Sequence, residues 1–401
     1  MRIFYRLCKM SSIMPPPQSL LKPMNFPRKS LYGPGPSNCP PRVLAACALP
    51  LLGHCHPEFF QIMDEIKEGV QYAFQTQNEL TLAISGTGHA GMEAAVCNMV
   101  EPKDVVVVFS AGLWGERFAD MAERHDADVR VVEKPMGAVF TLDDVKQALD
   151  HHKPSVAFIA HSESSSTVMQ PLEGIGDLCK SHNCILIVDC VASLGGAPMF
   201  MDQWNIDVLY SGSQKVLSCP PGAAPISLNQ RARNKLAARK TKVRSFYLDM
   251  NWLGNYWGCD GQPRKYHHTG PISSMYALRE GLSMLVEEGL EECQARHQKC
   301  ANILYEGLEK MGLKPFVKNK AHRLPTLTAV EVPDGIDWKK VSQYAMDKYK
   351  IELAGGLGAS AGKVWRLGFM GYNAQPENVR TTLRVLQEGI EWYRNSPQSK
   401  L

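Results

Sequence analysis

The sequence lacks several features that mark specialised classes of protein. Among its 401 residues, no apolar run is long enough to cross a bilayer, because Asp, Gly or Pro interrupts each candidate. The net charge of +4 is too small to indicate nucleic acid or an anionic membrane as a partner. The 12 cysteines are scattered without a CxxC pair or a secretory signal, which predicts reduced thiols in an intracellular protein. The remaining composition, 44% hydrophobic and 21% charged, is typical of a globular chain.

Motifs for metal and nucleotide binding are also weak. His54, Cys55 and His56 are adjacent on one extended stretch, so their side chains cannot easily converge on one ion, and we predict no metal site. Residues 355–363 have the glycine content of a P-loop, but Leu357 stands where the motif needs its first glycine.

One lysine stands in unusual surroundings. Lys215 closes the run YSGSQK (residues 210–215), which continues an apolar stretch starting at Ile206. Small hydroxyl residues bind phosphate oxygens, and glycine lets the backbone approach a ligand closely. A lysine in such a pocket can lose its proton and form a Schiff base with an aldehyde.

A buried strand upstream supplies an acid. Residues 184–189 read CILIVD, the pattern of a parallel strand that ends in the carboxylate of Asp189. An acid at this position can pair with a pyridine nitrogen while Lys215 holds an aldehyde, which is what a pyridoxal phosphate site needs. Because strand-end aspartates are common, the pair alone leaves purely structural roles equally open.

A glycine-rich segment gives two interpretations. Residues 85–91 (SGTGHAG) contain GxGxxG between a predicted strand, 80–84, and a predicted helix, 92–99. One interpretation is a dinucleotide site, but the next strand ends in Phe109 and Ser110, with no acid for a ribose. The other is a phosphate site, because glycines at a helix N-terminus bind phosphate, and pyridoxal phosphate carries one.

Alternation of strands and helices predicts the fold class, α/β with a mostly parallel sheet flanked by helices. Polar clusters follow the strands, so they should meet in one crevice at the C-terminal edge of the sheet. Strands are predicted at residues 80–84, 105–109, 129–132, 156–160 and 185–189, and helices at 59–74, 92–99, 142–149 and 172–182.

The pattern changes after Ala277, which predicts a smaller C-terminal α/β domain. It should contain one long helix or two over 278–311, strands at 326–332 and 364–368, and helices at 338–349 and 376–393. The expected division is a possible presequence (1–13), an extended proline-rich arm (14–36), a large domain (37–287) and a small domain (288–401).

Both termini resemble targeting signals. The chain ends in Ser399-Lys400-Leu401, the tripeptide that the peroxisomal import receptor recognises. Residues 1–13 contain three basic residues and no acid, as a mitochondrial presequence does, and a start at Met14 would remove them. We therefore expect a peroxisomal protein whose long form also reaches mitochondria; an unprocessed N-terminal tail is equally compatible with the residues.

Taken together, the motifs resemble the class V aminotransferases of pyridoxal phosphate fold type I, from about Pro16 to the C-terminus. The matching segments are LYGPGPSN (31–38), SGTGHAGMEAA (85–95), GLWGER (112–117), HSESSS (161–166), IVDCVASLGG (187–196), YSGSQKVL (210–217), NYWGCDGQPRKYHHT (255–269), RLPTLTAVEVP (323–333) and GKVWRLGFMG (362–371).

The resemblance implies a role for each matching residue. Lys215 is expected to be the Schiff-base lysine and Asp189 the partner of the pyridine nitrogen, while Arg366 and Gly35 are expected to bind the substrate. Arg366 also fits on chemical grounds, because a guanidinium binds a carboxylate with two hydrogen bonds. The remaining residues expected to hold pyridoxal phosphate are Thr87, Gly88, His89, Trp114, Ser164, Val191, Gln214, Tyr266 and Thr269, the last two lent by the partner subunit of a homodimer.

The implied activity is transfer of the amino group of L-alanine or L-serine to glyoxylate. The alternative on the same fold is a glyoxylate transaminase with kynurenine or 3-hydroxykynurenine as amino donor. Ser162 departs from the family pattern, which has Gly there, and residues 54–56 form a loop that varies between relatives. A cysteine desulfurase would need a reactive cysteine in the small domain, and residues 321–401 contain none. A binding protein without activity is disfavoured because Lys215, Asp189 and Arg366 are all present.

Overall fold

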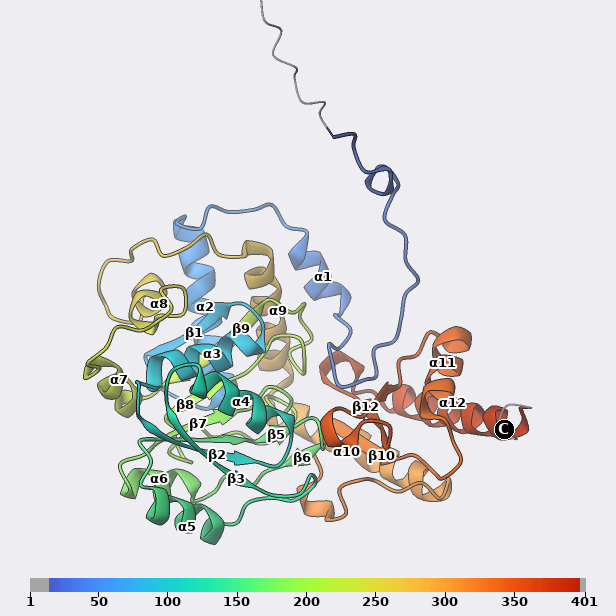
Figure 1. The fold of residues 1–401 in the computed structure, drawn as a ribbon. Helices are drawn as coiled ribbons and strands as arrows, with labels where there is room; N and C mark the ends of the chain where they lie inside the picture. Colours follow the sequence, from blue (N-terminus) through green and yellow to red (C-terminus); the bar gives the residue numbers. More distant parts are fainter. Residues whose placement is uncertain (1–13, 397–401) are drawn as a thin grey trace, which may run out of the picture.

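The computed structural model of this chain describes residues 14–396 (Figure 1). The two expected targeting signals, residues 1–13 and Ser399-Lys400-Leu401, lie outside the described residues. Within that range, no helix has both the length and the apolar composition needed to span a bilayer.

Residues 80–228 contribute the strands of a large mixed sheet. In the described residues it has seven strands in the order β1-β9-β8-β7-β4-β2-β3. Only β9 runs antiparallel to its neighbours, so the C-terminal ends of the other six meet at one edge. The strands are Leu80–Ser85 (β1), Val105–Ser110 (β2), Asp128–Glu133 (β3), Val156–Ala160 (β4), Ile185–Asp189 (β7), Val208–Tyr210 (β8) and Ala223–Leu228 (β9), beside the small hairpin Ser162–Glu163 (β5) and Val168–Met169 (β6).

Helices flank this sheet, and their sequences explain where they begin. Residues 92–99 were expected to form a helix, but α3 starts four residues earlier, at Gly88, because Thr87 already has the extended backbone of a helix cap. The helix expected over 172–182 begins only at Ile175, after Gly174 in a left-handed conformation (φ 82°). The helices are Pro41–Cys47 (α1), Pro57–Phe74 (α2), Gly88–Met99 (α3), Leu113–Glu123 (α4), Leu142–His152 (α5), Ile175–Ser181 (α6), Gln230–Ala237 (α7), Met250–Tyr256 (α8) and Ile272–Glu288 (α9).

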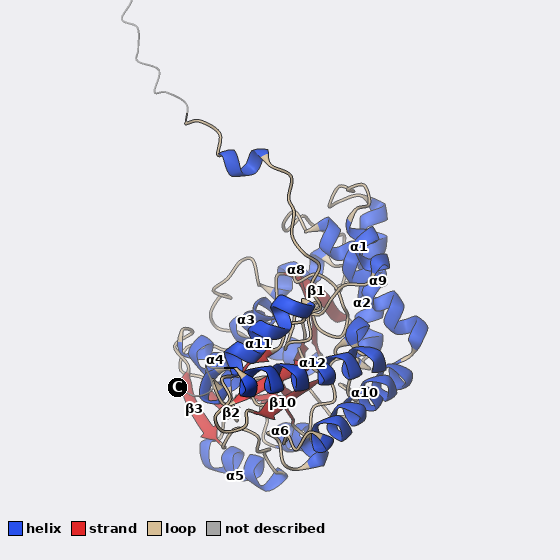
Figure 2. Cartoon of the chain, turned by 90° about the vertical axis from the view of Figure 1, so that its right-hand side faces the viewer, coloured by secondary structure: helices blue, strands red, loops and turns tan. Residues whose placement is uncertain are grey.

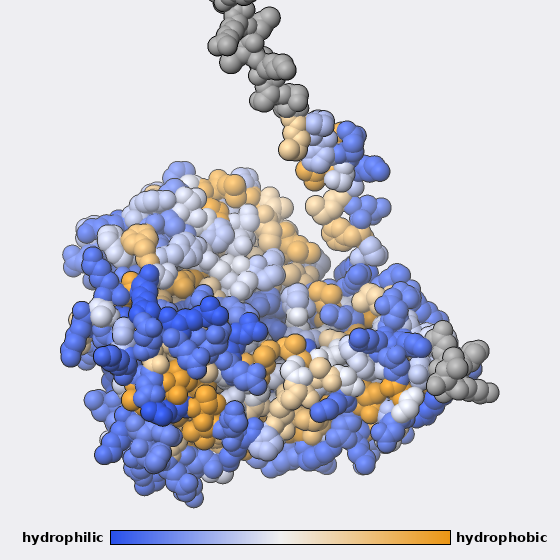
Figure 3. Space-filling view, viewed as in Figure 1, coloured by the Kyte–Doolittle hydropathy of each residue, from blue (hydrophilic) through white to orange (hydrophobic). Residues whose placement is uncertain are grey.

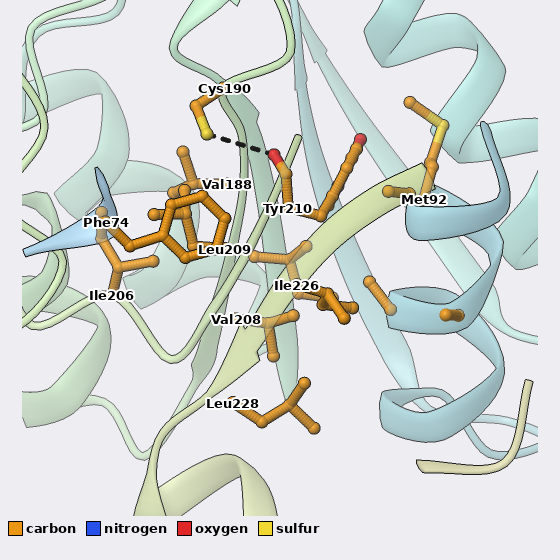
Figure 4. Packing of buried hydrophobic residues seen from close by; sticks show 14 of the residues in the cluster. Phe74, Met92, Val188, Cys190, Ile206, Val208, Leu209, Tyr210, Ile226 and Leu228 are labelled. Atoms are coloured by element: carbon orange, nitrogen blue, oxygen red, sulfur yellow. Dashed lines mark hydrogen bonds between the residues drawn. The ribbon is translucent and has the colours of Figure 1, made fainter. Parts of the chain in front are cut away.

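The core of the large sheet surrounds β8. Its residues are fully buried, with Phe74 of α2 and Val188 of β7 on one side of them and Met92 of α3 on the other (Figure 4). Strands buried on both faces read as continuous apolar runs, which is why β1, β2, β4 and β7 could be predicted from their sequence. Strand β9 (AAPISL) was missed, because its alanines and proline weaken the strand signal.

A second sheet forms the core of the C-terminal part. Its three antiparallel strands have the order β10-β12-β11, so β12, which carries Arg366, is central. Helices α10, α11 and α12 pack beside it, as the rotated view shows (Figure 2). Gly289 (φ 85°) separates α9 from α10, so residues 272–310 form two helices. The elements are Leu290–Lys310 (α10), Leu327–Glu331 (β10), Trp338–Tyr349 (α11), Ala354–Gly355 (β11), Val364–Gly368 (β12) and Pro376–Asn395 (α12).

The N-terminal arm has two parts. Residues 14–29 are exposed and stand clear of the body, with only a short 3-10 helix, Gln18–Leu21 (Figures 1 and 3). From Ser30 onward the chain docks: Ser30 forms a bridge with Ile351, and Tyr32 is buried in the core around β12. The expected arm of residues 14–36 is therefore free of the body only up to residue 29.

Candidate active site

The carboxyl edge of the large sheet contains a cavity of about 500 Å³, counting its open mouth. Residues from the ends of β4, β7 and β8 and from the starts of α3 and α4 surround it, as expected for an open α/β sheet. The lining consists of Gly88, His89, Met92, Trp114, Ser162, Ser164, Asp189, Val191, Ala192, Gln214 and Lys215.

Asp189 is a buried acid with one hydrogen bond to each carboxylate oxygen. The backbone N–H of Val191 donates to Oδ1 at 2.8 Å, and the Tyr210 hydroxyl donates to Oδ2 at 2.8 Å. Burial raises the pKa of the Asp189 carboxyl to about 6, although both hydrogen bonds and the charge of Lys215 lower it. Each oxygen keeps a lone pair free, so the carboxylate can accept a further N–H from a ligand.

Lys215 lies across the cavity, under the segment 33–36. Its ammonium donates to the backbone carbonyl of Pro34. Gly35 has φ of 107°, and a Cβ there would come within 2.5 Å of Lys215 Nζ, so only glycine fits over the lysine. Burial, and then the nearby charge of Arg366, lower the pKa of the Lys215 ammonium to about 8. A lysine with such a pKa is partly neutral near physiological pH and can act as a nucleophile or base.

The N-terminus of α3 offers a place for an anion. Thr87 is the cap residue, but its side chain makes no capping hydrogen bond to its own helix, so the hydroxyl is left for a ligand. The carboxamide oxygen of Gln214 is buried without a hydrogen-bond partner and lies close to Gly212. A phosphate group at this helix start would meet the donors that an anion needs: backbone N–H groups, the Thr87 hydroxyl and the NH2 group of the Gln214 amide.

Trp114 forms one wall of the cavity. Its indole N–H donates to Ser164 Oγ at 2.7 Å, and its backbone N–H donates to Glu163 Oε2 at 3.1 Å. The His89 ring packs edge-on against the indole, with centroids 5.4 Å apart. These contacts fix an aromatic face against which a flat ligand can stack. Val191 also lines the cavity and adds an apolar side chain to it.

Arg366 is a buried guanidinium beside the cavity. It is 7% exposed and donates to the carbonyls of Gly355 (2.8 Å) and Ser164 (3.2 Å). Between residues 14 and 396, no carboxylate forms an ion pair with it. A buried cation without a paired anion is costly, so the position suits a substrate that brings its own carboxylate.

The structure thus brings together most of the residues singled out from the sequence. Thr87 and Gly35 lie at the rim of the cavity: Thr87 precedes Gly88, and Gly35 lies over Lys215. Two expected residues are not part of this cavity: Tyr266 is 58% exposed, and Thr269 is exposed as well. Residues 14–396 contain no cluster of three or more side chains that could hold a metal ion.

Sequence reasoning missed three supporting residues. Glu163 is buried, and its carboxylate accepts from the backbone N–H groups of Ser165 (3.0 Å) and Trp114 (3.1 Å). Ser162, where glycine was expected, accepts from the backbone N–H of Ala192 at 3.1 Å. The third is Tyr210, whose hydroxyl donates to Asp189 Oδ2 at 2.8 Å. The single acid in HSESSS was a usable signal for Glu163, whereas the other two contacts depend on how the strands pair.

Comparison with known proteins defines the class. The family model "Aminotransferase class-V" matches residues 31–380, so the chain belongs to the class V aminotransferases, which depend on pyridoxal phosphate. The chain is 52% identical over 389 residues to the alanine–glyoxylate aminotransferase of Callithrix jacchus, covering 97% of this chain and 93% of that one. It is 36% identical to the (S)-ureidoglycine–glyoxylate transaminase of Bacillus subtilis, over 90% of each.

A solved structure agrees with these relatives. The crystal structure of alanine–glyoxylate aminotransferase from Nostoc sp. superimposes with a TM-score of 0.90 at 49% identity, covering 92% of this chain and 97% of that one. The expected fold, a mostly parallel sheet flanked by helices as in fold type I, is confirmed. The dinucleotide interpretation of residues 85–91 is wrong, because this segment belongs to an aminotransferase.

Proposed function

We propose that this chain transfers the amino group of L-alanine, or of L-serine, to glyoxylate, giving pyruvate or hydroxypyruvate and glycine. The relatives support the acceptor most strongly, because those from Callithrix jacchus and Bacillus subtilis are both named for glyoxylate but differ in the amino donor. The higher identity to the first supports alanine as donor. Kynurenine and 3-hydroxykynurenine are not favoured as donors.

The observation that carries the proposal is the buried guanidinium of Arg366 near Lys215, which forms no ion pair in the described part of the chain although the carboxyls of Glu163 and Glu352 are close enough to stabilise its charge. Pyridoxal phosphate fits the cavity, because the α3 start and Gln214 suit its phosphate, Trp114 suits its ring, and Asp189 suits its ring nitrogen. When bound, it supplies an aldehyde that carries the amino group and a ring that takes up electron density.

The protein's own residues supply the rest. Arg366 binds the carboxylate shared by alanine and glyoxylate and so fixes the α-carbon toward Lys215. Neutral Lys215 removes the α-proton, for which its pKa of about 8 is well suited. Ionised Asp189 keeps a proton on the ring nitrogen, which makes the ring a better acceptor of electrons.

The test uses the visible absorption of the purified protein loaded with pyridoxal phosphate. We expect the band of the bound cofactor to fall when L-alanine is added and to return when glyoxylate follows. A band that ignores alanine but responds to 3-hydroxykynurenine would contradict the proposed donor. Lys215→Ala serves as the control that should show neither response.

We also propose a homodimer in which each chain lends Tyr266 and Thr269 to the other's site. Support comes from their exposure away from their own cavity and from the exposed apolar residues of the arm, among them Leu20 and Phe26. Sedimentation should give twice the chain's mass. Mixing Lys215→Ala with Tyr266→Ala under exchange conditions should restore activity, because one site of each hybrid dimer is then intact; a monomeric, unrestored mixture would contradict the proposal.

For the targeting signals, we propose peroxisomal import through the C-terminal tripeptide and mitochondrial import of the form that includes residues 1–13. The support is the sequence of these segments alone. Imaging of the full-length form, the form starting at Met14 and a form without the last three residues should give three different distributions. Identical distributions would contradict it.

A further inference from the structure

The neighbour of Asp189 on the next strand is Tyr210. The two residues are register partners at the ends of the parallel strands β7 and β8, so their side chains project from the same face of the sheet. The phenol donates to Asp189 Oδ2 at 2.8 Å, while the backbone N–H of Val191 donates to Oδ1 at 2.8 Å. Together the two donors fix both the position and the rotation of the carboxylate.

The tyrosine itself is held on every side. It is fully buried, and its backbone carbonyl accepts from both the N–H (3.0 Å) and the thiol (3.2 Å) of Cys190 (Figure 4). Gly91 of α3 packs against it, since a Cβ at that position would lie 3.3 Å from Tyr210 Cβ and Cδ2. A ring with so little freedom can hold the carboxylate with little loss of entropy on ligand binding.

We infer that Tyr210 is a positioning residue that acts through Asp189: its phenol aims the carboxylate at the ring nitrogen of the cofactor and keeps it ionised. This inference rests on the role of Asp189 in the proposed function. It assigns a task to a hydroxyl that does not line the cavity and that neither the sequence pattern nor the relatives identify.

The charges around Asp189 show why a donor is needed. Burial favours the neutral acid, and the neighbouring carboxyl of Glu163, whose own pKa burial raises to about 7, adds negative charge when it ionises, whereas the Cys190 thiol stays neutral because burial raises its pKa well above the usual value. Among the residues that the structure describes, Lys215 is the cation whose charge lowers the pKa of the Asp189 carboxyl. Burial, and then the charge of Asp189, raise the pKa of the Tyr210 phenol well above its usual value, so it stays a donor at every working pH.

The test compares two ligands of the apo-protein: pyridoxal phosphate and an analogue with C–H in place of the ring nitrogen. Wild type should bind pyridoxal phosphate more tightly. Tyr210→Phe should reduce that preference about tenfold, the size expected when a hydrogen bond to a charged group is lost. Its affinity for the analogue should stay nearly unchanged, because that ligand does not use the carboxylate as an acceptor.

The matched control is Tyr349→Phe. Tyr349 also donates its phenol to a carboxylate, that of Glu388, but between α11 and α12 and away from the cavity. It should leave the preference between the two ligands as in wild type. The second readout is the pH dependence of affinity for pyridoxal phosphate, which should decline as the pH is lowered and Asp189 becomes protonated. In Tyr210→Phe this decline should begin about one pH unit higher than in wild type.

The outcomes separate two failures. If wild type shows no preference between the ligands, the proposed role of Asp189 is wrong, and the inference about Tyr210 is wrong as well. If wild type shows the preference and Tyr210→Phe keeps it in full, only the inference is wrong. Should Tyr210→Phe not fold, 3-fluorotyrosine at position 210 replaces it: its more acidic phenol should strengthen the preference, and an unchanged preference would overturn the inference.

Discussion

Two aspartates of neighbouring strands differ in a way that separates structure from function. Asp207 precedes β8 at the N-terminal edge of the sheet, and Asp189 ends β7 at the opposite edge. Both are buried. Asp207 accepts from Leu186 N–H (2.8 Å), Asn229 Nδ2 (2.8 Å) and the guanidinium of Arg231 (2.9 and 3.0 Å). Asp189 accepts from only two neutral donors.

The difference shows how a buried charge reveals a site. The acid at the N-terminal edge has its cation and its hydrogen bonds within the chain, so nothing is left for a ligand. Asp189, Lys215 and Arg366 lie near one another, yet none forms an ion pair in the described part of the chain. Buried charged groups without an ion pair are tolerated at functional sites, where a ligand can supply the missing partner.

The largest expected effect is that of Lys215→Ala. We expect turnover to fall by at least about a thousandfold, because the general base and the attachment point are both lost. The protein should stay folded, since the ammonium donates only to one backbone carbonyl. Steady-state kinetics and circular dichroism measure this, with the exposed Lys146→Ala as control; substantial residual turnover would remove Lys215 from the mechanism.

The comparison itself is tested by removing the charge of each aspartate. Asp207→Asn should lower the free energy of unfolding by about 3 kcal/mol, because Arg231 is left facing a neutral partner. Asp189→Asn should leave the apo-protein at least as stable as wild type but weaken cofactor binding. Chemical denaturation and cofactor titration of both variants measure this. Equal losses of stability would show that the two acids do not differ as described.

Arg366→Ala should raise KM for both amino and oxo substrates by about thirtyfold, the loss expected for a charge-assisted pair of hydrogen bonds. Affinity for pyridoxal phosphate should change little, because the guanidinium does not line the cofactor cavity. Arg366→Lys should recover only part of the loss, since an ammonium lacks the planar fork. A variant that loses cofactor and substrate affinity alike would contradict this separation.

The smallest effect is a pH dependence of stability. Unfolded lysine keeps its proton up to about pH 10.5, whereas Lys215 in the folded protein loses it near pH 8. Between these values the unfolded state binds more protons, so this group makes the apo-protein more stable as pH rises. Apo Lys215→Met should therefore have a larger free energy of unfolding than wild type below pH 8, with the difference shrinking toward pH 10.5. A pH-independent difference would place the lysine in a solvated environment.

The sequence predicted five of the six strands that run in the same direction and the residues that we propose to react, and the reason is local. Apolar β-branched runs such as residues 185–189 can form little else than buried strands, and a lysine among small residues is unusual by itself. What it could not indicate depends on pairing across the fold. The phenol of Tyr210 reaches Asp189 only because two strands align in register, and β9 is a strand only because its neighbours provide hydrogen bonds for it.

The most direct test of the central claim is to find which lysine holds the cofactor. Borohydride reduction of the loaded protein, followed by peptide mass mapping, fixes the cofactor to its attachment point. We expect one phosphopyridoxyl group per chain, on Lys215. A group on any other lysine, or none at all, would contradict the assignment of this cavity as the active site.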